Sequence, residues 1–414
     1  MEPKNLIVGV DLNRRESQIC YYERNSQDAV SAPVKVGSSR ATFPTLLCRV
    51  PDTGEWHYGL EAEYFAEQKN GVLIDRLYDL CSDGNTFSAE GETFEGGELL
   101  AAFLRQALTM VGVTKAERQI AGIMITVPRL TKPFVQAIRK AYGLLGIPRG
   151  RGYLQDYRES FYFHTLCQKQ ELWARKVGLF QFEEDNVAFC SLELNFRTKP
   201  VTASVTEGKT VKLSREPGKR DQEFSEFIEA SLKQDLYSSI YLVGDGFDRS
   251  WADRSVALLC RGKRKVFAGD NLFARGACFA AREKTEDKSL KGYLYLGEDL
   301  IRFNVGMDMK VNGCPVYYPL VTAGVNWYET ENECEFLLDG TRALVFVVSS
   351  MEEGKRRRYG MALPGLPKRP DRTTRIRLRI EFDSPGRCQI TAEDLGLGEL
   401  FPSSGKIWHE TMEG

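Results

Sequence analysis

Two apolar runs of the sequence end at residues that could contact a ligand. The first, at residues 6–10, stops at Asp11, and the second, at 240–243, stops at Gly244-Asp245-Gly246. A glycine-rich turn between a strand and a helix lets the backbone approach a ligand, and the helix start offers free N–H groups. Taken alone, Asp11 fits an aspartate that caps a turn better than a catalytic acid. The sequence therefore predicts one ligand-binding turn and one candidate acid.

Common catalytic signatures are not found in the sequence. No G-x-x-x-x-G-K-[ST] phosphate loop and no complete G-x-G-x-x-G occurs, and none of His57, His164 and His409 lies near a nucleophile-elbow pattern. The ten cysteines include no C-x-x-C pair, which argues against a zinc site and a disulfide framework. We therefore expect buried thiols in a reducing compartment.

The composition is that of a globular protein with two or three domains. The chain has 414 residues, of which 42% are hydrophobic and 27% charged, and its net charge is -1. The net charge is therefore too small to attract the protein to nucleic acid or to an anionic membrane. The start of the chain lacks the features of a signal peptide, and the sequence has no apolar run long enough to span a membrane. We expect a cytoplasmic protein.

Residues 1–287 carry alternating strand and helix patterns, which predict an α/β domain. Its halves are expected at about 1–180 and 181–287. The expected elements are, in order, strands 6–11 and 18–22, helix 98–111, strand 119–127, helices 134–145 and 157–175, strand 186–194, hairpin 200–213, helix 223–235 and strand 240–243.

From about residue 288 the helical period gives way to the alternation typical of strands. Apolar and charged residues alternate along 375–382, which predicts a strand with one buried and one wet face. Asn312-Gly313 and Asp339-Gly340 predict hairpin turns. We place a boundary within 284–291. The expected domains are an α/β domain at 1–287, an all-β sandwich at 288–405 and a tail at 406–414.

Read in order, these segments resemble the actin-like ATPase superfamily, and most closely the seventy-kilodalton heat-shock (DnaK-like) chaperones. The similar segments of the first half are residues 7–13 (first phosphate strand and turn), 42–46, Ile125-Thr126-Val127-Pro128 with the helix after it, 155–160 and 275–281 (connecting helices), and 242–247 (adenosine strand). Residues 361–367 and 383–394 resemble the chaperone's β-sandwich and give the most specific signal. The resemblance implies an actin-like (ribonuclease H-like duplicated) α/β domain and an all-β peptide-binding sandwich, without the family's helical lid.

The resemblance also implies a set of site residues. Asp11 would be a catalytic and metal-binding acid, and Asp156 stands where the family has a glutamate, so both would be catalytic only in an active enzyme. The cofactor, if there is one, would be ATP or ADP with Mg²⁺. The residues that would contact the nucleotide are Asn13, Arg14, Arg15, Gly244, Asp245, Gly246, Phe247 and Gly276.

Departures from the family pattern fall in the phosphate loops. Arg14 and Arg15 replace small residues that let backbone wrap the phosphates. The second phosphate loop is expected at 191–195, where the glycines are missing, and the family's lysine is replaced by Asp75 or Arg76. Between residues 195 and 223 there is too little chain for an adenosine-clamping subdomain. Phosphoryl transfer depends on such positioning groups, so the sequence favours a domain without catalysis.

We therefore favour a non-catalytic or weakly nucleotide-binding scaffold that binds peptide or protein at the sandwich edge by strand addition. The alternatives are an active ATP-dependent chaperone and an actin-like filament or assembly protein. The basic run 355–358 fits a solvated loop, and the aromatic run 157–163 fits a core segment. No nucleic-acid or membrane partner is expected. The sequence leaves the client and the oligomeric state open.

Overall fold

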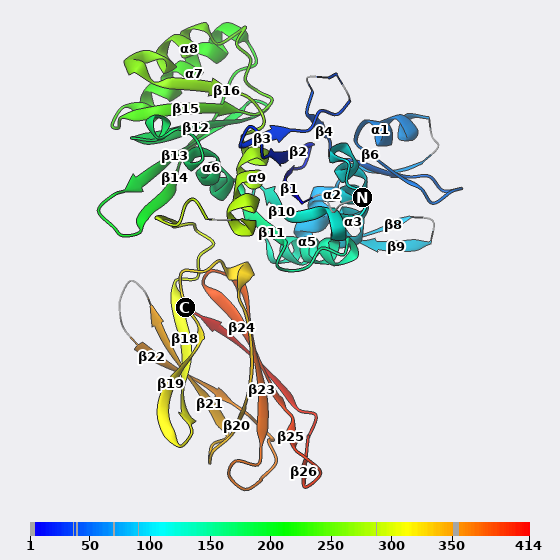
Figure 1. Cartoon of the computed structure of the whole chain (residues 1–414), viewed down its shortest axis with the longest axis vertical. Coiled ribbons are helices and arrows are strands. Elements are labelled where there is room, and N and C mark those ends of the chain that lie inside the picture. Colours follow the sequence, from blue (N-terminus) through cyan, green and yellow to red (C-terminus); the bar gives the residue numbers. More distant parts are fainter. Residues whose placement is uncertain are drawn as a thin grey trace. The chain divides into compact units, whose positions relative to one another are not determined.

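The chain divides into two compact units, Met1–Gly297 (unit 1) and Glu298–Gly414 (unit 2), in the computed structural model (Figure 1). The structure describes residues 5–35, 37–38, 40–68, 71–89, 91–286, 288–350 and 356–414. In these ranges no helix is long and apolar enough to cross a membrane. The thiols of all ten cysteines, which lie within the same ranges, are free.

The first sheet of unit 1 has the strand order β11-β10-β1-β2-β3, with β4 also paired to β2. β1 runs antiparallel to β2 and parallel to β10, and β10 runs parallel to β11. β1 is an almost uninterrupted buried run, which suits a central strand covered on both faces. The bounds are β1 Leu6–Leu12, β2 Glu16–Glu23, β3 Asp28–Ser31, β4 Thr42–Pro44, β10 Ile120–Val127 and β11 Gly152–Asp156.

The second sheet repeats this arrangement. Its order is β16-β15-β12-β13-β14, with β17 added beside β14. β12, β13 and β14 are antiparallel to their neighbours among these three, as in the first sheet, while β15 and β16 run parallel to β12. Unit 1 therefore contains one strand topology twice. The bounds are β12 Lys176–Glu183, β13 Asn186–Asn195, β14 Val201–Lys212, β15 Tyr237–Val243, β16 Lys265–Ala268 and β17 Tyr293–Tyr295.

Two helices, α6 (Tyr157–Leu166) and α9 (Leu272–Thr285), pack against each other between the two sheets (Figure 1). α6 follows the first sheet in the chain but buries Phe161 and Leu166 against the second sheet, whereas α9 follows the second sheet and packs against β1 and β10 of the first. The helices approach closely, since a Cβ atom on Gly276 would lie 2.0 Å from Ser160 O. The pair therefore links the two halves of unit 1.

The remaining elements surround this frame. α7 and α8 cover the second sheet through a cluster of buried phenylalanine and leucine side chains. The bounds are α1 Gly59–Glu67, α2 Leu77–Asp83, α3 Gly96–Ala107, α4 Ala116–Gln119, α5 Lys132–Leu144, α7 Pro217–Leu232, α8 Asp253–Leu259, β5 Leu47–Arg49, β6 Trp56–Tyr58, β7 Val72–Ile74, β8 Thr86–Ala89 and β9 Glu92–Glu95.

Unit 2 consists of two four-stranded antiparallel sheets in the orders β19-β18-β21-β22 and β20-β23-β24-β27. The rings of Phe303 and Phe382, one from each sheet, lie 5.7 Å apart. The bounds are β18 Phe303–Val311, β19 Cys314–Val321, β20 Glu331–Leu337, β21 Ala343–Ser350, β22 Arg356–Ala362, β23 Arg375–Ser384, β24 Arg387–Asp394, β25 Gly396–Leu397, β26 Phe401–Pro402 and β27 Ile407–Glu413.

Several predicted elements of unit 2 are confirmed. The alternating strand is β23, in which Ile376, Leu378 and Ile380 are buried and the arginines between them are not. Asn312-Gly313 is a hairpin turn with positive φ at both residues. Asp339-Gly340 is not a hairpin turn, because it connects β20 of one sheet to β21 of the other.

The predicted boundary and tail are wrong. Unit 1 extends to Gly297 because β17 pairs in parallel with β14. The expected tail at 406–414 contains β27, which pairs with β24 along its whole length. The predicted boundary residue Asp287 and the first residue of the basic run, Lys355, lie outside the described residues.

The predicted elements of the second half of unit 1 also need correction. β12 was not expected, the helix begun at Tyr157 ends at Leu166, and the hairpin expected at 200–213 is one long strand, β14. Residues 191–195, expected as a phosphate loop, lie inside β13. By the repeated topology, the counterpart of the β1–β2 turn is the turn at Glu184 and Asp185, between β12 and β13.

A buried ion pair joins the end of β24 to the preceding loop of unit 2. Asp394 Oδ1 and Oδ2 accept hydrogen bonds from Arg369 Nη1 and Nη2 at 2.8 and 2.9 Å, and both side chains are almost fully buried. The backbone N–H groups of Gly396 and Ser404 donate to the same carboxylate. Burial alone would raise the pKa of Asp394, but the bonds from Arg369 and Ser404 outweigh it and hold that pKa well below its usual range.

We predict that Asp394→Asn lowers the free energy of unfolding of unit 2 by about 3–5 kcal/mol, because the Arg369 guanidinium stays buried without its counter-charge. The depressed pKa adds a pH signature. In the wild-type chain the stabilisation is present above the unfolded pKa of about 4 and is lost as the pH falls below it. Urea unfolding of the full chain, followed by tryptophan fluorescence, measures both effects, and Trp408 on β27 reports on this region.

The matched control is Asp308→Asn, which removes an exposed ion pair with Arg358 at 3.3 Å. We expect a change of less than about 1 kcal/mol there. Equal losses in the two variants would contradict the assignment of the stabilisation to the buried pair.

Candidate functional site

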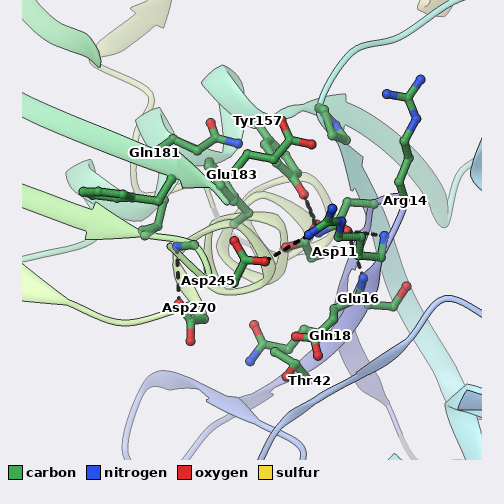
Figure 2. Close-up of a pocket in the computed structure, with 18 of the residues that line it drawn as sticks. Asp11, Arg14, Glu16, Gln18, Thr42, Tyr157, Gln181, Glu183, Asp245 and Asp270 are labelled. Atoms are coloured by element: carbon green, nitrogen blue, oxygen red, sulfur yellow. Dashed lines mark hydrogen bonds and ion pairs between the residues drawn. The ribbon is translucent and has the colours of Figure 1, made fainter. Parts of the chain in front are cut away.

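A cavity of about 240 Å³ lies in unit 1, where the turns after β1 and β12 face each other (Figure 2). The first sheet contributes the β1–β2 turn, and the second contributes the ends of β12 and β15. The starts of α6 and α9 supply Tyr157 and Phe273. The lining residues are Asp11, Asn13, Arg14, Arg15, Glu16, Ser17, Gln18, Thr42, Tyr78, Pro128, Tyr157, Gln181, Phe182, Glu183, Val243, Gly244, Asp245, Asp270 and Phe273.

The cavity brings together six of the site residues expected from the sequence. They come from the two turns, which lie far apart in the chain, and they are Asp11, Asn13, Arg14, Arg15, Gly244 and Asp245. Four others, Asp156, Gly246, Phe247 and Gly276, are not among its lining residues, nor are Asp75 and Arg76.

Each of these four has another structural role. Asp156 caps α6, since its Oδ1 accepts a hydrogen bond from the backbone N–H of Glu159 at 2.8 Å. Phe247 packs in the aromatic cluster of the second half. At Gly246 a Cβ atom would lie 2.2 Å from Glu184 O, and Gly276 is required by the close approach of α9 to α6. The glycines therefore serve backbone packing.

Asp11 is a buried acid at the end of β1. Asp11 is 5% exposed, and the Tyr157 hydroxyl donates a hydrogen bond to Asp11 Oδ1 at 2.6 Å. The Tyr157 ring in turn stacks on Phe273, with ring centroids 3.7 Å apart. Burial raises the pKa of Asp11 to about 7, and the Tyr157 hydrogen bond offsets part of the shift. The group can therefore exchange a proton near neutral pH.

The β1–β2 turn is closed by its own polar groups. Asn13 Oδ1 accepts hydrogen bonds from the backbone N–H groups of Arg15 and Glu16 at 2.9 and 3.0 Å. Arg14 Nε donates to Asp79 Oδ1 at 2.7 Å. The backbone N–H groups of Arg15 and Glu16 and the Arg14 guanidinium, which could otherwise bind a phosphate, are therefore bonded to protein groups.

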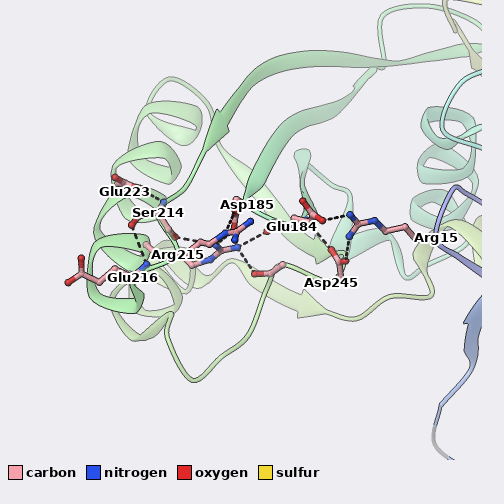
Figure 3. A network of polar contacts seen from close by, with 10 residues as sticks. Arg15, Glu184, Asp185, Ser214, Arg215, Glu216, Glu223 and Asp245 are labelled. Carbon is pink, nitrogen blue, oxygen red and sulfur yellow. Dashed lines mark hydrogen bonds and ion pairs between the residues drawn. The ribbon is translucent and has the colours of Figure 1, made fainter.

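Arg15 reaches across to the second half (Figure 3). Its guanidinium pairs with Glu184, and Nη1 lies 3.4 Å from Asp245 Oδ2. Asp245 also accepts a hydrogen bond from the backbone N–H of Glu184 at 3.1 Å. Arg220, whose side chain is buried, ties this turn down by donating to Glu184 O and Gly246 O at 2.7 and 3.0 Å.

The turn at Gly244 is also in contact with protein groups. Gly244 has φ +101°, and a Cβ atom there would lie 1.9 Å from Phe182 O, so glycine is required by conformation and by packing. Its backbone N–H donates to Asp270 Oδ1 at 3.3 Å. The glycine in this predicted ligand-binding turn therefore contacts protein.

The lining is rich in acceptors. Its carboxylates are Asp11, Glu16, Glu183, Asp245 and Asp270, whereas its cations are Arg14 and Arg15. Among the described residues, no group of three or more histidine, cysteine, aspartate or glutamate side chains could hold a metal ion. Asp11 and Asp156, which the alternative of an active ATPase would place around Mg²⁺, are not part of such a group.

Sequence reasoning missed Tyr157, Phe273, Gln18 and Asp270. The aromatic run at 157–163 was assigned to the core, and Phe161 and Tyr162 are buried as predicted. Tyr157 is also buried, but its hydroxyl reaches Asp11. The only sequence signal for it was its position at a strand-to-helix junction.

Two family models match the chain. One, described as the C-terminal part of a family of unknown function (DUF5716), matches residues 28–298, well over half of the chain. The chain belongs to the DUF5716 family. The second, a domain of unknown function (DUF8552), matches residues 300–414. A search of curated proteins finds no match.

The DUF5716 and DUF8552 matches meet at the division between units 1 and 2. The DUF5716 match contains Tyr157, Gly244 and Phe273 of the cavity, whereas Asp11 and the β1–β2 turn precede its first matched residue. The family descriptions assign no activity to either unit.

We predict that Asp11→Asn stabilises this DUF5716 protein at and above neutral pH. The folded chain keeps the Asp11 proton up to about pH 7, while the unfolded chain releases it near pH 4, so the free energy of unfolding falls as the pH rises between these values. Asparagine can still accept the Tyr157 hydrogen bond and avoids the buried charge. The gain should approach, at most, about 4 kcal/mol above pH 7.

Thermal unfolding of both proteins from pH 5 to pH 8 measures this effect. The matched control is Glu183→Gln, at an exposed position of the same cavity, which should leave the pH dependence unchanged. A loss of stability in Asp11→Asn at every pH would show that the carboxylate is needed in its charged form.

Proposed function

We propose that this protein is a relative of the DnaK-like chaperones whose actin-like domain does not turn over nucleotide and whose all-β unit contacts a protein or peptide. The repeated strand topology of unit 1 supports the actin-like part of the proposal, since that fold is a duplication. The two antiparallel sheets of unit 2 support a sandwich after it. A cytoplasmic location is part of the proposal and fits the ten free cysteines.

The proposed absence of turnover rests on one observation: the hydrogen-bond donors around the cavity are already bonded to protein groups. The backbone N–H groups of Arg15 and Gly244 are bonded to side chains, and both loop arginines are paired with carboxylates. A triphosphate needs free N–H groups and cations in a preorganised arrangement. Here it would displace existing bonds and face several carboxylates.

The contact surface lies at the β19–β20 edge of unit 2. Met307, Tyr318 and Phe346 are partners across β18, β19 and β21 and therefore share the inner face of their sheet. Met307 and Phe346 are buried, but Tyr318 is 41% exposed and its inner-face neighbour Val316 is 43% exposed. The apolar interior thus reaches the surface at this edge.

The opposite sheet completes this edge. Asn332 of β20 donates its side-chain N–H to Leu320 O of β19, so the two strands lie side by side. Cys334 and Phe336 share the inner face of β20 with Asn332 and are only half-buried. An apolar partner side chain could therefore be covered from both sheets.

Strand addition at β19 itself is disfavoured. The two-residue turn makes Val311 and Cys314 a hydrogen-bonded pair, so the backbone groups of Pro315, Tyr317 and Pro319 point away from β18. Prolines have no N–H, which leaves Tyr317 as the donor of this edge. We therefore expect a partner to bind mainly through apolar side chains.

Calorimetric titration with ATP and with ADP in magnesium buffer tests the first part. We expect dissociation constants weaker than about 1 mM and no phosphate release, because the required donors are already bonded. An active chaperone ATPase in the same buffer is the positive control. Tight binding with turnover that Asp11→Ala abolishes would establish the active chaperone instead.

A peptide array scanned with the full chain tests the second part. We predict that Val316→Asp weakens binding to apolar peptides about tenfold or more, since a charge is placed on the open inner face. Val345→Asp is the matched control, because Val345 is 46% exposed but lies on the outer face of the same sheet. Equal binding by the two variants would remove the β19–β20 edge from the proposal.

A further inference from the structure

The cavity in unit 1 is lined by five carboxylates and two arginines. Arg14 is bonded to Asp79 and Arg15 to Glu184, neither of which lines the cavity. Of the five lining carboxylates, Asp245 also lies against Arg15 and Glu16 pairs with Arg40. Asp11, Glu183 and Asp270 have no ion pair among the described residues. The interior therefore favours a ligand that carries positive charge and donates hydrogen bonds.

A separate observation at Gln18 indicates the same ligand chemistry. Gln18 lies on β2, is 4% exposed and lines the cavity. Among the described residues, none donates a hydrogen bond to its buried Oε1 atom. A buried carbonyl oxygen without a donor is unfavourable, so a ligand N–H group at this point would stabilise the site.

The remaining lining suits the apolar part of such a ligand. Tyr78, Tyr157, Phe182 and Phe273 supply ring surfaces, and an ammonium group over an aromatic ring is attracted to it. Acceptors stand on both halves of unit 1, with Gln18 and Glu16 on one and Asp245 and Asp270 on the other (Figure 2). A molecule with positive groups at both ends could contact both halves.

We propose that the cavity binds a linear primary di- or polyamine, with one ammonium group donating to Gln18 Oε1 and another to the carboxylate of Asp270. Each ammonium group offers three donors and needs no metal. The methylene chain lies along the aromatic side chains. The proposal rests on the proposed function, because a cavity built for a triphosphate would not accept a polycation.

Titration of the full chain with spermidine and with putrescine tests this proposal. We expect saturable binding in calorimetry, with a rise in the unfolding temperature that weakens as salt is added. The neutral 1,4-butanediol, which has the length of putrescine without its charges, should not bind. ATP is titrated separately into the same protein.

Two variants locate the site. Gln18→Leu removes the acceptor and Asp270→Asn removes a charge, and each should weaken spermidine binding about tenfold, whereas Glu229→Gln on the exposed face of α7 should have no effect. Circular dichroism checks that each variant is folded. If Asp270→Asn does not fold, Gln18→Leu alone is used for the test.

The outcomes separate the two proposals. Amine binding that depends on Gln18 and Asp270, with no ATP binding, supports both. Failure of every amine to bind overturns the amine proposal and leaves the proposed function standing. ATP binding without amine binding overturns both. Amine binding that Glu229→Gln weakens as much as Gln18→Leu does is general counterion attraction, and it also overturns the amine proposal.

Discussion

The close packing of α6 on α9 is the constraint on which unit 1 depends. Each helix follows one sheet in the chain and packs on the other, and the approach at Gly276 and Ser160 leaves no room for a side chain. The same pairing stacks Tyr157 on Phe273, at the two helix starts, and so carries the Tyr157 hydroxyl to Asp11. The inner wall of the cavity is thus a consequence of how the two halves are joined.

The charges of the cavity follow from that geometry. Because the halves are held face to face, Arg15 of the β1–β2 turn can pair with Glu184 of the corresponding turn in the second half. Both arginines of the β1–β2 turn are therefore paired with carboxylates from other elements, while Gln18 and Asp270 line the cavity as acceptors. The proposed absence of nucleotide turnover and the proposed binding of an amine both rest on this distribution of donors and acceptors.

The sequence predicted the local features and missed the distant ones. Strand β1 with Asp11, the turn at Gly244 and strand β23 follow from apolar runs, glycine and alternation. Tyr157 could not be assigned to Asp11, because their contact joins positions 146 residues apart. Gly246 was misassigned for a physical reason: a glycine required by a neighbouring backbone oxygen has the same sequence signal as one that admits a ligand.

The two units present different kinds of groups to a ligand or partner. On the outer face of the β20–β23–β24–β27 sheet, Arg377 and Arg379 pair with glutamates of β20. The open groups of unit 2 are the apolar side chains at the β19–β20 edge, whereas those of unit 1 are acceptors inside a cavity. This difference is the reason why we propose a small cation as the ligand of unit 1 and an apolar protein segment as the partner of unit 2.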